Sequence, residues 1–131
     1  MSKMILGAVI VLAALALLFF GGQSITGKAI STTVDSGTAV FQVTAKSFAF
    51  EPNEIRVKQG QKVRLEVTVP AGDPSPHAIA LPDFKVNKYT ELGQTTAVDF
   101  VANKPPGTYN GFCSFFCGSG HRDMKFKVIV E

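Results

Sequence analysis

Residues 38–69 read TAVFQVTAKSFAFEPNEIRVKQGQKVRLEVTV, and this stretch decides the fold of the 131-residue chain. Apolar and polar side chains alternate with a period of two, and many of the apolar ones are β-branched or aromatic, as in half-buried strands. The alternation is cleanest in residues 63–69, where one face is apolar and the other mostly charged. Gln59-Gly60 marks a turn. The pattern predicts strands over residues 38–45, 48–50, 55–57 and 63–69.

The chain beyond residue 69 continues the same pattern of short alternating segments between turn signals. Outside the N-terminus, no segment has a convincing helical period. Seven or so short strands at regular spacing are typical of an antiparallel β-sandwich, so we expect one all-β domain over residues 38–131. The further predicted strands cover residues 77–81, 95–101, 108–112 and 124–130.

The N-terminus is a separate, strongly apolar segment. Residues 4–20 read MILGAVIVLAALALLFF, and no charge occurs between Lys3 and Lys28. A helix of this length spans roughly 25 Å, and the longer uncharged stretch can cross a bilayer core. A cleaved secretory signal is the alternative, but the apolar run is longer than is usual in such signals and residues 21–24 make a poor cleavage site. We expect a retained transmembrane helix.

This segment sets the expected topology. Residues 1–23 form the anchor, with residues 4–22 in the membrane, and residues 24–37, rich in Ser, Thr and Gly, form a flexible linker. Lys3 keeps the N-terminus in the cytoplasm under the positive-inside tendency. We therefore expect a single-pass protein of the cell membrane, with its C-terminal domain extracytoplasmic, on the periplasmic or outer face.

Charge excludes one class of partner. The formal net charge is +3, and Lys3 and Lys28 flank the anchor, so the globular part is nearly neutral. No cluster of Lys and Arg indicates nucleic-acid binding, and no run of acids offers a docking face for a basic protein.

Residues 113–124, CSFFCGSGHRDM, hold two thiols, an imidazole and a thioether within twelve residues. These are the soft and borderline donors that suit copper. His77 is the only other histidine, and a fold that brings it to this loop would supply more ligands than one copper normally takes. Two thiolates that bridge a pair of copper ions would explain the second cysteine. Gly118 and Gly120 allow the backbone to turn tightly between the donors.

Simpler interpretations exist for each residue alone. Two extracytoplasmic cysteines often form a disulfide, a lone histidine more often satisfies a hydrogen bond, and a methionine beside a strand is usually core. The ordered set Cys, Cys, His, Met favours a metal site. Aromatic residues near the loop could shield such a site or could equally belong to the core: Phe84, Tyr89, Phe112, Phe115 and Phe116.

The loop resembles the binuclear copper A (CuA) loop of cytochrome c oxidase subunit II, a pattern shared with the C-terminal domain of nitrous oxide reductase. The resemblance covers residues 38–131 and implies a Greek-key cupredoxin sandwich, with FAFEPNEIRVKQGQKVRLEV in the place of the early strands. It implies two copper ions in a mixed-valence centre. The implied metal ligands are bridging Cys113 and Cys117, terminal His77 and His121, weak axial Met124 and the backbone carbonyl of Phe115.

The same resemblance implies a function. We expect electrons to pass from a cytochrome c or small cupredoxin, through the copper centre, to the haem of the catalytic subunit of a haem-copper oxidase. The chain itself would make or break no substrate bond. The alternatives are a free-standing CuA carrier, a copper storage or delivery module, and a plain sandwich with a Cys113–Cys117 disulfide.

Two departures from the subunit II pattern matter. Many members have an acidic residue where this chain has Phe115, which removes a magnesium ligand but keeps the backbone carbonyl. The chain also has no Trp, which many relatives use where the electron enters. A single anchor resembles the compact subunits of the b-type oxidases.

Overall fold

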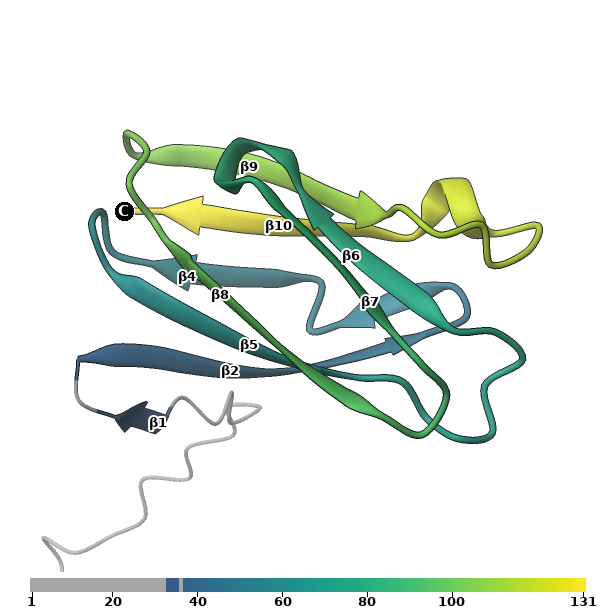
Figure 1. Ribbon diagram of the computed structural model, residues 1–131. Coiled ribbons are helices and arrows are strands. Elements are labelled where there is room, and N and C mark those ends of the chain that lie inside the picture. Colours follow the sequence, from purple (N-terminus) through teal and green to yellow (C-terminus); the bar gives the residue numbers. More distant parts are fainter. Residues whose placement is uncertain (1–32, 36) are drawn as a thin grey trace, which may run out of the picture.

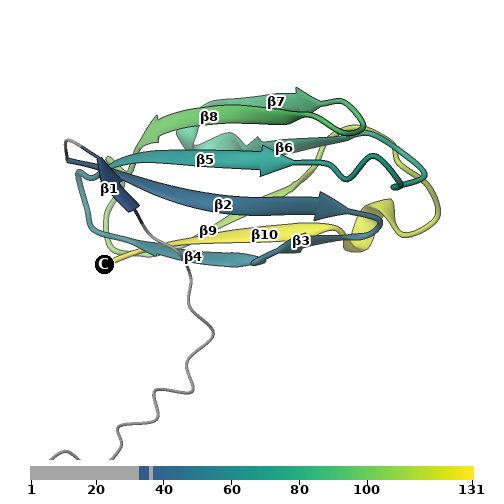
Figure 2. The same ribbon diagram turned by 90° about the horizontal axis from the view of Figure 1, so that it is seen from below.

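The computed structural model describes residues 33–35 and 37–131, which form two β-sheets packed face to face (Figures 1 and 2). The expected anchor, residues 1–23, and most of the expected linker lie outside the described residues. Within the described part of the chain, no helix combines the length and the apolar character needed to cross a bilayer. The all-β prediction is confirmed for this part.

The first sheet is built on the long strand β2. Its hydrogen-bonded order is β1-β2-β5-β8, and β3 also pairs with β2. Every second residue of β5 points into the molecule, so the period-two pattern of the sequence becomes a buried face and a solvent face. The strands are β1 (Thr33–Asp35), β2 (Thr38–Lys46), β3 (Ala49–Glu51), β5 (Lys62–Thr68) and β8 (Thr95–Val101).

The second sheet carries the candidate site residues. Its order is β4-β10-β9-β6-β7, and the central strands β9 and β6 pair antiparallel. All five residues of β6 are buried. The strands are β4 (Glu54–Val57), β6 (His77–Leu81), β7 (Val86–Thr90), β9 (Gly107–Cys113) and β10 (Lys125–Val130), and two short 3-10 helices are η1 (Pro82–Phe84) and η2 (His121–Asp123).

The sandwich is mixed rather than purely antiparallel, which corrects our expectation. β2 pairs parallel with β5, and β4 pairs parallel with β10. Between β2 and β5 the chain leaves the first sheet, contributes β4 to the second and returns in the original direction. Such a crossover places two strands of the same sense side by side, and alternation within each strand does not reveal it.

Two strands escaped the sequence analysis. Strand β7 has only its end residues Val86 and Thr90 buried, so its three central residues show no alternation. Strand β1 lies within residues 24–37, the segment expected to be a linker. Both lie at an edge of their sheet.

The core lies between the sheets and fixes their relative position. Leu65 and Val67 face it from the first sheet, and Phe126 and Val128 from the second, all at most 1% exposed. Phe50 meets Phe126 edge to face, with ring centroids 5.8 Å apart. Full burial of each such side chain contributes about 1.5–3 kcal/mol.

One end of the sandwich gathers the segments that matter for the site. Strands β2, β5, β7 and β9 end there, and β6, β8 and β10 begin there. The loop of residues 114–124 projects from this end, opposite the C-terminus (Figures 1 and 2). We call it the metal loop.

Candidate metal centre

The two thiols lie side by side at the start of the metal loop. Cys113 is the last residue of β9, and Cys117 follows within the loop. Both are free and buried, at 1% and 8% exposure, with their Sγ atoms 3.9 Å apart. Their sulfurs are therefore shielded from solvent and close enough to bind the same metal ion.

His77 reaches the thiols from the neighbouring strand. It begins β6, and the β6–β9 pairing aligns Ile79 with Cys113. Its imidazole is 1% exposed, and Nδ1 lies 3.9 Å from Sγ of Cys113. The ligand atoms of His77, Cys113 and Cys117 all lie within 4.8 Å of one another. The preceding residues 70–76 include three prolines, which restrict the path of the backbone into β6.

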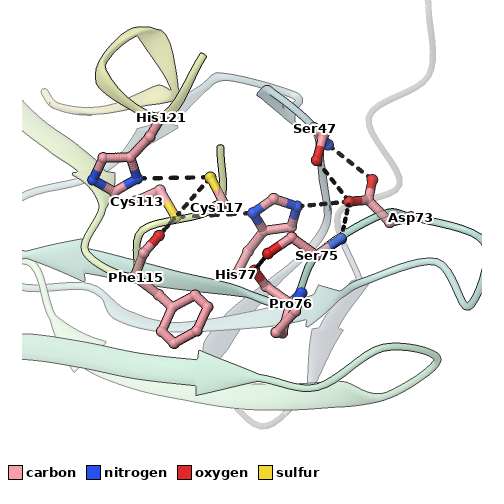
Figure 3. A network of polar contacts seen from close by, with 9 residues as sticks. All are labelled: Ser47, Asp73, Ser75, Pro76, His77, Cys113, Phe115, Cys117 and His121. Carbon is pink, nitrogen blue, oxygen red and sulfur yellow. Dashed lines mark hydrogen bonds and ion pairs between the residues drawn. The ribbon is translucent and has the colours of Figure 1, made fainter. Parts of the chain in front are cut away.

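His121 lies on the other side of the thiols. It is the first residue of η2, and its Nδ1 lies 3.6 Å from Sγ of Cys117. The imidazole is partly exposed, and its ring centroid lies 5.5 Å from that of Phe116. Four donor groups thus form a row, His77–Cys113–Cys117–His121, with an imidazole at each end (Figure 3).

The backbone carbonyl of Phe115 points toward the same sulfurs. The thiol of Cys113 donates to it at 3.2 Å, while the Phe115 ring turns away from the thiols (Figure 3). That ring packs edge to face on Tyr89, with centroids 5.1 Å apart. The carbonyl oxygen is therefore available as a metal ligand whatever the side chain at this position.

Met124 closes the metal loop and is fully buried. The amide of Cys113 donates to its carbonyl at 3.0 Å, so Met124 is fixed beside the end of β9. Its role as an axial ligand stays a prediction.

The glycines of the metal loop lie on the ring of Phe48. A Cβ at Gly120 would lie 2.3 Å from Cδ2 of Phe48, and one at Gly118 would lie 2.9 Å from Cζ. We attributed these glycines to tight turns, and Gly118 does have a φ of +131°. The structure adds close packing on a residue that the sequence analysis did not connect to the site.

A buried carboxylate, Asp73, supports His77 from behind and was also missed. Its Oδ1 lies 3.0 Å from His77 Nε2, and Ser47 and Ser75 donate further hydrogen bonds to it. Burial alone would raise the pKa of Asp73, but the bonds from Ser47, His77 and Ser75 outweigh it and hold this pKa below its ordinary value. An acid four residues before the histidine was the available sequence signal.

Burial has the opposite result at the thiols. It raises the pKa of Cys117 to about 11, with the neighbouring Cys113 as a further cause. The metal-free thiol is therefore protonated at neutral pH, and any metal that binds its sulfur must displace the proton.

The donor set fits copper. Thiolates and imidazoles are soft and borderline ligands. Among the described residues, the cluster whose ligand atoms lie within 4.8 Å of one another is His77, Cys113 and Cys117, and it contains no carboxylate. All three are buried, and two paired strands hold His77 and Cys113, so these ligands are in place before a metal arrives.

Comparisons with known proteins agree with this fold. A family profile described as a cupredoxin-like domain matches residues 8–130. The nitrous-oxide reductase of Cupriavidus necator is 33% identical over 91 residues, which cover 69% of this chain and 14% of that protein. Cytochrome c oxidase subunit 2 of Thermus thermophilus is 29% identical over 89 residues, which cover 68% of this chain and 63% of that one. The chain thus spans less than two thirds of these relatives.

Solved structures share the fold. The periplasmic domain of cytochrome oxidase subunit II from Bradyrhizobium japonicum has a TM-score of 0.61 at 24% identity, covering 70% of this chain and 83% of that one. A chain of a heme-copper terminal oxidase dimer has a TM-score of 0.61 at 20% identity, covering 99% and 97%. With the profile match over nearly the whole chain, these findings mean that the protein belongs to the cupredoxin-like domain family.

Proposed function

We propose that this protein transfers electrons through a binuclear copper centre of the CuA type. The observation that carries the proposal is the row of four donors in which two adjacent thiols lie between two imidazoles. One copper would leave part of this set unused, whereas two coppers that share both sulfurs would use all of it. Bound copper would supply one-electron redox chemistry.

The chain's own residues support this role by holding the ligands still and dry. Cys113, Cys117 and His77 are each less than 9% exposed, and two strands of one sheet carry Cys113 and His77. Rigid, preformed ligands change little between oxidation states, which favours rapid electron transfer. We assign the weak outer positions to Met124 and to the Phe115 carbonyl.

The surface around the metal loop supports contact with redox partners. Phe116, next to His121, is 74% exposed, and further large apolar side chains are exposed at the same end. We propose that a cytochrome c or small cupredoxin delivers electrons here, and that the haem of an oxidase catalytic subunit receives them. The similarity to oxidase subunit 2 supports that choice of acceptor. The other exposed apolar side chains at this end are Tyr89, Leu92, Phe112 and Phe115.

We further propose that residues 4–22 anchor the protein in the cell membrane, with the sandwich outside the cytoplasm. The uncharged apolar run in the sequence supports the anchor. The fold shared with a periplasmic domain of an oxidase subunit agrees with the location.

A free-standing carrier with the same centre is the second candidate. Nitrous-oxide reductases also match this chain, so the similarity is not confined to oxidase subunits. A copper delivery module is less favoured, since delivery needs accessible thiols and both thiols are buried. Co-purification of a haem-containing catalytic subunit from native membranes separates an oxidase subunit from a free-standing carrier.

The proposal is tested by electron paramagnetic resonance of the full-length, copper-loaded protein in detergent. We expect two coppers per chain by elemental analysis and a seven-line pattern from one electron shared by two nuclei. A four-line pattern with one copper per chain would reject the binuclear centre.

A further inference from the structure

Asp73 lies directly behind the imidazole of His77, on the side away from the thiols. Its Oδ1 is 3.0 Å from His77 Nε2, and the two side chains are 6% and 1% exposed. A carboxylate so deeply buried needs several hydrogen bonds to remain ionised.

Two of those hydrogen bonds come from a segment far away in the sequence, and one comes from a near neighbour. Ser47, in the turn between β2 and β3, donates its amide to Oδ2 at 2.8 Å and its hydroxyl to Oδ1 at 2.7 Å. The amide of Ser75 donates to Oδ1 at 3.3 Å. Figure 3 shows the carboxylate held between Ser47 on one side and His77 on the other. Its orientation is therefore fixed by two separate loops.

This arrangement determines which nitrogen of His77 carries the proton. The carboxylate accepts, so Nε2 donates, and the lone pair of Nδ1 is left facing Cys113. A carboxylate behind a metal-binding imidazole also increases the basicity of the ring.

His121 has no equivalent support. In the part of the chain that the structure describes, its Nε2 has no hydrogen-bond partner, and its ring is partly exposed beside Phe116. The two imidazoles at the ends of the donor row therefore differ in burial and in hydrogen bonding.

We propose that Asp73, held by Ser47, is a positioning residue that fixes the His77 tautomer and makes His77 a stronger donor than His121. The two metal positions are then electronically unequal, with the oxidised state favoured on the His77 side. This inference rests on the proposed function and adds to it a cause for asymmetry within the centre.

The test compares Asp73→Asn and Ser47→Ala with the natural sequence, using full-length protein in detergent and copper as the probe. Asp73→Asn should weaken copper retention against a chelator by about 10–100-fold. It should also make the nitrogen hyperfine couplings of the two imidazoles more alike and raise the reduction potential. Ser47→Ala should change each quantity in the same direction and by less, because the backbone amide of residue 47 still donates its hydrogen bond to Asp73.

Asp83→Asn is the matched control. Asp83 is an exposed acid in η1, beyond the far end of β6, so this variant removes the same charge away from the site. Copper retention, hyperfine couplings and potential should all stay at their natural values.

A purely structural role would give a different result. Asp73→Asn would then lower copper retention and protein stability, but the couplings of the loaded centre would stay as they were, and that outcome overturns the inference. Should Asp73→Asn fail to fold, Ser47→Ala decides by the same readouts.

The inference and the proposed function fail separately. A natural protein that holds a single copper contradicts the binuclear centre, and a changed imidazole coupling in Asp73→Asn would still reveal the support of His77. A natural protein with the binuclear signal, combined with unchanged retention and couplings in both variants, contradicts the inference alone.

Discussion

At the scale of single residues, the pair of thiols is what distinguishes this site from a one-copper site. Each cysteine has one imidazole on its outer side and the other thiol on its inner side. Replacement of either sulfur removes a donor that the proposed function assigns to both metals. The two cysteines are therefore expected to be equally important, although only Cys113 belongs to a strand.

We expect Cys113→Ser and Cys117→Ser each to abolish the binuclear signal and to lower copper content from two to at most one per chain. A hydroxyl is a poor bridging ligand for soft metals. Ser119→Ala, in the same loop and exposed, is the control and should keep both coppers. A serine variant that retained the copper-thiolate absorption would contradict the bridging role.

Met124→Leu tests the axial position. The two side chains have similar volumes, so the buried site should lose less than about 1.5 kcal/mol of stability. Copper content should stay the same while the reduction potential shifts, because a weak axial ligand tunes the metal rather than holds it. Redox titration of the loaded protein measures the shift, and an unchanged midpoint would remove Met124 from the ligands.

At the scale of elements, the metal loop is held against the sandwich by packing as well as by its backbone hydrogen bonds. Gly118 and Gly120 lie so close to Phe48 that an added Cβ would overlap it, and Phe48 follows the end of β2. The loop that holds Cys117 and His121 thus depends on the same turn that positions Ser47. The turn of residues 47–48 therefore contacts both the metal loop, through Phe48, and the support of His77, through Ser47.

Gly120→Ala should lower the free energy of unfolding by about 1–3 kcal/mol, because its Cβ would overlap the Phe48 ring. Urea denaturation of the metal-free protein measures the change. Gly72→Ala is the control, since a Cβ there meets nothing within 4 Å. Gly120→Ala should cost less in a Phe48→Ala background, because that change removes Cγ and Cδ2 of Phe48, and additive effects of the two changes would contradict direct packing.

An ion pair joins β5 to β8 on the outer face of the first sheet. Arg64 donates to both oxygens of Asp99, at 2.7 and 3.0 Å, and this bond together with the positive charge lowers the pKa of Asp99 despite slight burial. The pair stabilises the fold at pH values above the ordinary Asp pKa of 3.8, and the contribution disappears as pH falls through the lowered value.

Asp99→Asn should therefore lower the free energy of unfolding by about 0.2–1 kcal/mol at neutral pH, since both side chains are about half exposed. The difference from the natural protein should vanish in strong acid and shrink in high salt. Denaturation curves at several pH values measure it. A difference that persisted in acid would contradict an electrostatic cause.

At the scale of the whole molecule, the donors join two distant parts of the chain, so metal binding and folding are coupled. His77 begins β6, whereas the remaining donors lie at the end of β9 or in the metal loop after it. Copper should stabilise the folded protein against heat and denaturant, by about 2.7 kcal/mol at a free concentration 100 times the dissociation constant. Scanning calorimetry with and without copper measures this, and a transition unaffected by copper would contradict a site formed only on folding.

Much of the fold could be predicted because strand patterns are local. Residues 63–69 alternate regularly, and β5 occupies Lys62–Thr68 with that alternation as its burial pattern. Strand β7 could not be predicted, since its central residues are all exposed. The parallel pairing of β2 with β5 also escaped prediction, because it depends on where the chain crosses between sheets.

The candidate site divides in the same way. The thiols, His121 and Met124 lie within one short segment, so their spacing alone indicated a metal loop. Ser47 was missed because it lies 26 residues from Asp73, and a serine in a turn has no distinctive pattern. Phe48 resembled any core aromatic residue until the glycines above it were placed.

The sequence by itself determined the kinds of donor present and the all-β character of the domain, since side-chain chemistry and period-two alternation are properties of short segments. Only the tertiary structure decided that His77 meets Cys113, that Asp73 holds its far nitrogen and that His121 stays partly exposed. The physical reason is that these contacts depend on strand pairing and loop packing between segments tens of residues apart. No local pattern encodes that arrangement.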